Sequence, residues 1–192
     1  MNKIVIAALF FAAISFVSCK KKTLFQQVSS FHSGIKFNNH IIESDSINPL
    51  DKVNIYNGGG VGVGDFNNDG LPDLYFTGNM VSNKLYLNKG DFKFDDVTDA
   101  AAVGGEGRWA RGVAVVDINN DGLADIYVCN TLYEDSLKRR NILYINTGND
   151  KNGVPHFKNM AKEYGLEVST QSTMVSFFDY DNDGDLDMYL TV

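Results

Sequence analysis

Three acidic segments of this sequence share one spacing of oxygen-bearing side chains. The first, DFNNDGLPD, begins at Asp65, and the related segments DINNDGLAD and DYDNDGDLD begin at Asp117 and Asp179. In each segment, positions 1, 3, 5 and 9 carry a carboxylate or amide side chain. Carboxylates this close repel one another unless a cation lies among them. The spacing therefore predicts a site for a hard divalent cation, since Ca²⁺ takes about six to eight oxygen ligands.

Position 6 of each segment is a glycine, at Gly70, Gly122 and Gly184. Glycine permits the positive φ of a sharp turn, which brings the position-7 backbone carbonyl toward the ion. A single copy could equally be a hairpin held by Asx turns, but three copies in one register favour the metal site. The predicted ligands are Asp65, Asn67, Asp69, the Leu71 carbonyl and Asp73; then Asp117, Asn119, Asp121, the Leu123 carbonyl and Asp125; then Asp179, Asp181, Asp183, the Asp185 carbonyl and Asp187.

The flanking residues and the charge indicate which ion and which kind of loop to expect. Mg²⁺ prefers strict octahedral geometry and keeps its waters, so Ca²⁺ is the better match. About three Ca²⁺ ions would bring the formal net charge from -7 to about -1. An EF-hand needs a glutamate at position 12 and flanking helices, whereas these segments have Phe76, Val128 and Leu190 there. We therefore expect a β-type calcium loop closed by the position-9 aspartate.

Short strands must position these segments, because apolar and aromatic residues alternate or cluster on both sides of them. The first aspartates are 52 and 62 residues apart, which is close to the period of propeller blades. Similarity continues beyond the segments, from NKLYLNKG at 83–90 to NILYINTG at 141–148. We predict an all-β fold of β-propeller blades, each with four antiparallel strands, at 56–107 and 108–170, with a partial blade at 171–192. Because only about two and a half blades are present, we expect the sequence to be a fragment of a longer protein.

The acidic segments resemble the FG-GAP or VCBS repeats of integrin-type propellers, which carry Asp-x-Asp/Asn-x-Asp-Gly-x-x-Asp between the first two strands of a blade. The resemblance covers about residues 58–192 and implies that the side chains named above bind calcium. The stretch LFQQVSSFHSGIKFNN at 24–39 is similar to the start of VCBS proteins that end in an ASPIC/UnbV region. Residues 23–55 are expected either to pack on the first blade or to supply a closing strand.

The N-terminal residues predict export. Lys3 is followed by an apolar run at 4–17, broken only by Ser15, which is shorter than the roughly 20 residues of a membrane span. FVSC followed by KKK resembles the lipobox of bacterial lipoproteins, which implies a signal peptide at 1–18, lipidation of Cys19 and a linker that leads into the first blade at 19–55. A plain signal peptide with a chance cysteine is the alternative. Lys20 replaces the aspartate associated with inner-membrane retention, so the resemblance implies an outer-membrane lipoprotein.

Several function classes are disfavoured. The net charge of -7, without a dense basic tract past residue 22, argues against nucleic-acid binding. The three histidines lack metal spacing and no nucleophile motif is recognisable, so we expect no catalysis. The glycine-rich stretch at 57–65 fits neither phosphate-loop pattern and predicts an innermost strand that other backbones approach closely. Cys129 is predicted to be a small buried hydrophobe, and Trp109 to pack between blades.

The predicted function is that of a calcium-binding propeller segment in the bacterial cell envelope, which binds or adheres to carbohydrate or protein. Calcium is expected to be structural. The insertion at 131–140 is the first candidate for a partner contact, because loops on a rigid scaffold commonly carry binding residues. Two alternatives stay open: the N-terminal part of a polysaccharide-acting enzyme, and an envelope assembly scaffold.

Overall fold

A computed structural model describes residues 23–192, so the predicted signal peptide at 1–18 and the predicted lipidation site Cys19 lie outside the described residues. The described chain is nearly all β-structure, in three antiparallel sheets whose strands follow sequence order. The first sheet contains β1 (Val61–Gly64), β2 (Asp73–Phe76), β3 (Lys84–Asn88) and β4 (Phe94–Asp96). The second contains β5 (Ala110–Val116), β6 (Asp125–Asn130), β7 (Ile142–Asn149) and β8 (Pro155–Asn159), and the third contains β9 (Met174–Phe178) and β10 (Asp187–Thr191).

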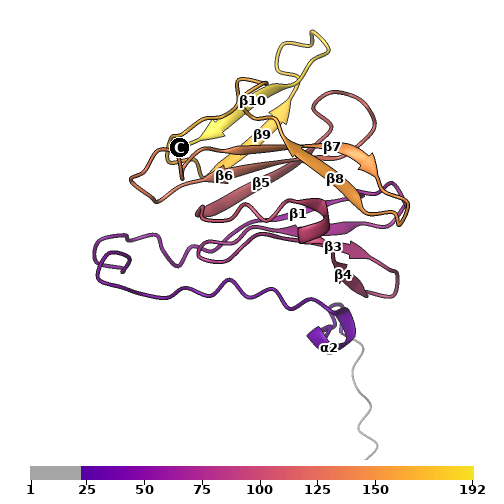
Figure 1. The fold of residues 1–192 in the computed structure, drawn as a ribbon, viewed down its shortest axis with the longest axis horizontal. Coiled ribbons are helices and arrows are strands. Elements are labelled where there is room, and N and C mark those ends of the chain that lie inside the picture. The colour runs from indigo at the N-terminus through magenta and orange to yellow at the C-terminus, as the bar shows by residue number, and fades with distance from the viewer. Residues whose placement is uncertain (1–22) are drawn as a thin grey trace, which may run out of the picture.

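The three sheets stack face to face in the order in which the chain makes them (Figure 1). The first strand of the second sheet, β5, contacts β1 on one side and β9 on the other. Sheets of four, four and two strands therefore confirm the predicted all-β class and partial propeller blades. Two four-residue helices complete the described structure: α2 (Ser30–Ser33) precedes the first sheet, and α3 (Thr98–Ala101) follows β4. None of the helices in this part of the chain is both long and apolar enough to span a bilayer.

Glycines on β1 allow the first two sheets to approach each other closely. A Cβ added at Gly62 would lie 2.9 Å from Val115 Cγ2 on β5, and one added at Gly64 would lie 2.8 Å from Val115 Cγ1. Just before β1, a Cβ added at Gly59 would lie 1.9 Å from the main-chain oxygen of Thr77. The glycine-rich stretch thus contains the edge strand β1, and neighbouring atoms approach its backbone closely, as its sequence predicted. Its place as the innermost strand of a closed propeller stays a prediction.

Two apolar cores hold the stack together. Phe66, Tyr75 and Leu85 from the first sheet pack with residues of the second sheet, and the rings of Phe66 and Phe157 meet edge to face at 6.2 Å. The other core joins the second and third sheets and contains Cys129, which is fully buried as expected. Burial raises the pKa of the Cys129 thiol to about 12. Trp109 is also buried, and its ring lies 6.3 Å from that of Tyr133.

The segment before β1, residues 23–55, first runs along the face of the first sheet that points away from the second sheet (Figure 1). Its later residues reach the insertion at 131–140 of the second sheet, where Lys52 lies 3.4 Å from Glu134. Phe37 stacks on Phe76 of β2 with ring centroids 5.1 Å apart. The side-chain amide of Asn39 donates to Asn79 Oδ1 at 2.6 Å, and the main-chain N–H of Asn79 donates back to Asn39 Oδ1 at 2.9 Å. Of the two expectations for this lead-in segment, packing on the first blade is the one observed.

Candidate metal sites

The three acidic segments form the turns β1–β2, β5–β6 and β9–β10, here called the first (65–73), second (117–125) and third (179–187) loops. Their backbones share one conformation, with positive φ at positions 4 and 6. The residues and φ values are Asn68 (53°) and Gly70 (86°), Asn120 (57°) and Gly122 (83°), and Asn182 (60°) and Gly184 (94°). Position 6 was predicted from its glycine. Position 4 was missed, although the asparagine found there in all three loops is a residue that tolerates left-handed backbone.

The position-1 aspartate closes each loop on itself. Asp65 accepts the main-chain N–H groups of Asp69 at 3.0 Å and Gly70 at 2.8 Å. Asp117 accepts the equivalent pair at 3.0 and 2.8 Å, and Asp179 accepts it at 3.2 and 3.1 Å. A carboxylate offers about four lone-pair directions, so these bonds leave each position-1 group able to bind a cation as well.

The position-9 aspartates of the first two loops are buried at the start of β2 and β6. Asp73 accepts the N–H groups of Phe66 at 3.0 Å and of Asn88, on the third strand of its sheet, at 2.7 Å. The pKa of Asp73 is raised to about 6, chiefly by burial and to a lesser extent by the charges of Asp69 and Asp65, although the two hydrogen bonds lower it. Sequence reasoning expected a metal ligand here and missed the second role, which is to fasten the loop to the third strand.

Asp125 repeats this arrangement in the second loop. It accepts the N–H groups of Ile118 at 3.0 Å and Asn146 at 2.8 Å, and burial likewise raises its pKa. In the third loop, Asp187 accepts the N–H of Tyr180 at 2.8 Å and is exposed.

In the third loop, three of the predicted side-chain ligands lie close together. Asp179, Asp181 and Asp187 each place a carboxylate oxygen within 4.8 Å of the others, in the one cluster of this kind among residues 23–192. Asp183 instead accepts the main-chain N–H of Asp185 at 3.1 Å, and that bond lowers the pKa of Asp183. In the other loops the position-3 amide turns to position 5: Asn67 Nδ2 donates to Asp69 Oδ2 at 3.0 Å, and Asn119 Nδ2 to Asp121 Oδ2 at 2.9 Å.

The composition of the three loops fits a hard divalent cation. Their predicted donors are all oxygen atoms, without the nitrogen or sulfur ligands that softer metals prefer. Leu71, Leu123 and Asp185 follow directly on the left-handed glycines, and the role of their carbonyls as ligands stays a prediction.

The second sheet clamps the first loop, which sequence reasoning did not foresee. Asn146 Nδ2 donates to the Phe66 carbonyl at 2.9 Å, and Asn149 Nδ2 donates to the Asn67 carbonyl at 2.7 Å. Asn68 of the first loop reaches the carbonyl of Gly122 in the second loop at 3.2 Å. The only sequence signal for this clamp is the asparagine that recurs at the end of β3 and within β7.

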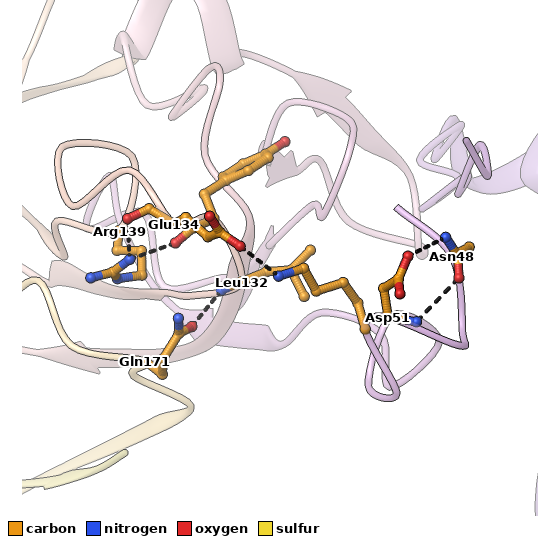
Figure 2. A network of polar contacts seen from close by, with 8 residues as sticks. Asn48, Asp51, Leu132, Glu134, Arg139 and Gln171 are labelled. Atoms are coloured by element: carbon orange, nitrogen blue, oxygen red, sulfur yellow. Dashed lines mark hydrogen bonds and ion pairs between the residues drawn. The ribbon is translucent and has the colours of Figure 1, made fainter. Parts of the chain in front are cut away.

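The insertion at 131–140 lies at the opposite end of the strands from the acidic loops, because it connects β6 to β7. Figure 2 shows the polar network that fixes it. Arg139 donates to the carbonyls of Tyr133 at 2.7 Å and Glu134 at 2.6 Å, and Gln171 Oε1 accepts the N–H of Leu132 at 2.7 Å. Lys52 of the lead-in segment lies 3.4 Å from Glu134. This insertion is therefore an ordered part of the surface.

Comparison with known proteins finds one matching family model and similar curated proteins. Residues 49–128 match the model for the FG-GAP-like repeat. Cartilage acidic protein 1 of Xenopus tropicalis is 32% identical over 138 residues, which are 71% of this chain and 20% of that protein. The Homo sapiens protein of the same name is 30% identical over 138 residues, with the same coverage, and the Mus musculus one is 28% identical over 132 residues, or 69% of this chain and 19% of the relative. The chain spans about one fifth of the length of these curated relatives. The matched residues 49–128, which include the first two acidic loops, are similar to the FG-GAP-like repeat.

Proposed function

We propose that the three acidic loops bind about three Ca²⁺ ions and that these ions are structural. The observation that carries this proposal is the convergence of Asp179, Asp181 and Asp187 oxygens within 4.8 Å, in a loop whose backbone conformation recurs twice. A bound cation would supply the positive charge that offsets the repulsion among these carboxylates. Hydrogen bonds within each loop already satisfy main-chain N–H groups, as at Asp65. The ion would therefore stabilise a turn that the chain forms locally.

Calcium titration of the melting temperature tests the sites. Each ion at a hundredfold excess over its dissociation constant would add about 2.7 kcal/mol to the free energy of unfolding. We expect Ca²⁺ to raise the melting temperature more than Mg²⁺ at the same concentration. The double variant Asp117→Ala, Asp121→Ala should lose about one bound ion and keep the other two. The control variant Asp95→Ala, Asp99→Ala removes two exposed carboxylates outside the loops and should bind calcium as the wild type does.

The chain is, in this proposal, a non-catalytic binding module of a bacterial cell envelope, exported through residues 1–18 and anchored in the outer membrane by a lipid on Cys19. Similarity to the FG-GAP-like repeat and the resemblance to lipoproteins support this role. Its ligand is a carbohydrate or a protein, and it does not bind nucleic acid. The ordered surface around 131–140 is the contact region, because a loop held by Arg139 and Gln171 loses little conformational entropy on binding.

Two experiments test this module. Glycan and protein arrays probed with the chain should give binding without turnover, and Leu137→Asp, an exposed position in the insertion, should reduce it. Release of products from a polysaccharide would contradict the non-catalytic role. Labelling with a radioactive fatty acid in a bacterial host should modify the wild type and not Cys19→Ser, and equal labelling of both would contradict the anchor.

A further inference from the structure

The turn between β7 and β8, residues 150–154, reaches from the second sheet to the first acidic loop (Figure 1). The second sheet takes ten residues between Asn146 and Phe157, whereas the first sheet takes five between the aligned residues Asn88 and Phe94. Five residues are enough to join the two strands. The added length is therefore available for the contact with the first loop.

Hydrogen bonds within the β7–β8 turn hold its shape. Asp150 Oδ1 accepts the N–H groups of Asn152 at 2.8 Å and Val154 at 3.0 Å. The N–H of Gly153 donates to the Asp150 carbonyl at 3.0 Å, and the N–H of Asp150 donates to the Val154 carbonyl at 2.9 Å. Gly153 has a φ of 76°, which glycine adopts at little cost. The turn thus presents the main-chain carbonyl of Gly153 in a defined position.

The contact falls on Asn67, the predicted ligand at position 3 of the first loop. The Gly153 carbonyl accepts Asn67 Nδ2 at 3.4 Å. Asn149 Nδ2, at the end of β7, donates to the main-chain carbonyl of Asn67 at 2.7 Å. Asn67 is only 8% exposed, although it lies in a surface turn. The second sheet therefore holds both the main chain and the side chain of this ligand.

The contact also bears on which atom of the Asn67 amide can bind a cation. Only the amide oxygen has lone pairs for a metal, because the nitrogen is a donor. Asn67 Nδ2 donates to Asp69 Oδ2 at 3.0 Å as well as to Gly153, and Asn67 Oδ1 accepts the Asp69 N–H at 3.3 Å. If the Asp69 carboxylate binds a cation, Nδ2 keeps the Gly153 carbonyl as its acceptor. The amide oxygen then stays directed to the loop.

We propose that the β7–β8 turn sets the calcium affinity of the first loop by holding Asn67 in its ligand orientation. This proposal rests on the proposed function, in which the acidic loops bind Ca²⁺. A ligand that is already held loses less conformational freedom when the ion binds, so the turn raises the affinity. Asn149 and Gly153 are positioning residues, because they act on the ion through Asn67.

A calcium titration followed by two-dimensional NMR of the amide groups tests the proposal one loop at a time. The N–H groups of Gly70 and Gly122 report on the first and second loops, since each donates to the position-1 aspartate of its own loop. Calcium is set by a chelator buffer. Asn149→Ala should raise the calcium concentration at half-saturation about two- to tenfold at Gly70, which is the net value of one hydrogen bond. The value at Gly122 should stay unchanged.

Two further variants complete the test. Replacing residues 149–156 with the Asp-Phe-Lys of 91–93 gives the second sheet the shorter turn of the first sheet, and it should raise the half-saturation concentration at Gly70 more than Asn149→Ala does. The matched control is Asn152→Ala, in the same turn, because the Asn152 side chain donates to Asp150 within the turn at 3.3 Å. This control should titrate as the wild type does at both glycines. If the shortened turn prevents folding, Asn149→Ala decides, since it changes one exposed side chain.

The outcomes separate this proposal from the calcium proposal itself. Calcium-dependent shifts at Gly70 with the same half-saturation concentration in the wild type and Asn149→Ala would overturn the role of the turn and leave calcium binding intact. Equal increases at Gly70 and Gly122 would also overturn it, because a general loss of stability affects both loops. A wild type whose Gly70, Gly122 and Gly184 resonances do not respond to calcium would overturn both proposals.

Discussion

The side-chain amide of Asn146, in the second sheet, donates to the main-chain carbonyl of Phe66, in the first sheet, across 2.9 Å. The same amide also donates to the carbonyl of Ala124, in the second acidic loop, at 3.3 Å. The main-chain N–H of Asn146 donates to Asp125 of that loop. One residue thus joins two acidic loops of successive repeats. The two loops are therefore joined by hydrogen bonds through Asn146.

The first prediction concerns this link. Asn146→Ala should lower the free energy of unfolding by about 1–3 kcal/mol, because it leaves the buried Phe66 carbonyl without its donor. The matched variant is Asn88→Ala, since Asn88 Nδ2 donates to Pro72 within its own sheet at 2.8 Å and is partly exposed. Urea unfolding in excess EDTA should show the smaller loss for Asn88→Ala. Equal losses would contradict a special role for the bond between sheets.

The position-9 aspartates should contribute differently to the stability of the metal-free protein, although each is a predicted calcium ligand. Asp125→Ala should cost about 2–5 kcal/mol without metal, because one buried and one partly buried N–H group lose their acceptor. Asp187→Ala should cost much less, since Asp187 is exposed and accepts one described main-chain N–H. Each variant should still lose about one calcium ion. Unfolding of both variants in EDTA, beside their calcium content, separates the two roles, and similar losses of stability would count against the buried anchor.

Because Asp73 is buried, we expect the stability of the metal-free protein to depend on pH. Burial raises its pKa to about 6 from an ordinary value of 3.8. Between these two values the folded chain binds more protons than the unfolded chain, so the Asp73 contribution to stability falls as pH rises from about 4 to 6. The pKa difference corresponds to a loss of up to about 3 kcal/mol. Asp125 acts in the same direction.

Urea unfolding of the metal-free wild type and Asp73→Asn from pH 4 to 7 measures this effect. The stability advantage of the wild type should shrink with rising pH, because asparagine does not titrate. Added calcium should reduce the dependence, since a cation favours the ionised carboxylate. A wild-type advantage that stays constant across this range would show that Asp73 does not titrate there.

The close approach of Gly59, just before β1, to the main-chain oxygen of Thr77 gives a further prediction. Gly59→Ala should destabilise the protein by about 1–3 kcal/mol or more, because its Cβ would overlap the Thr77 main-chain oxygen, which cannot move aside as a flexible side chain can. Val61→Ala, two residues on and 54% exposed, should cost less. Thermal unfolding of the two variants compares them, and a larger loss for Val61→Ala would place the close contact elsewhere.

The local parts of this structure could be predicted from the sequence, and the long-range parts could not. Gly70 and its counterparts predicted the sharp turn, and alternation of apolar residues predicted the strands, because both depend on neighbours in the chain. The bond from Asn146 to Phe66 joins residues 80 positions apart, and no local pattern marks it. The two roles of Asp73 also look alike in sequence, since a carboxylate that binds metal and one that anchors a strand are the same residue.

The lead-in segment shows the same limit. Its composition left open whether it packs on the first blade or supplies a strand, and the stacking of Phe37 on Phe76 settles this through a contact between distant residues. Export and lipidation at Cys19 stay predictions, because they concern residues outside the described part of the chain.

The calcium content of the purified chain tests the central claim most directly. Elemental analysis after equilibrium dialysis against calcium, with the free ion subtracted, should give about three Ca²⁺ per chain, and about two for the Asp117→Ala, Asp121→Ala variant. A chain that retains no calcium above the dialysis buffer would contradict the account.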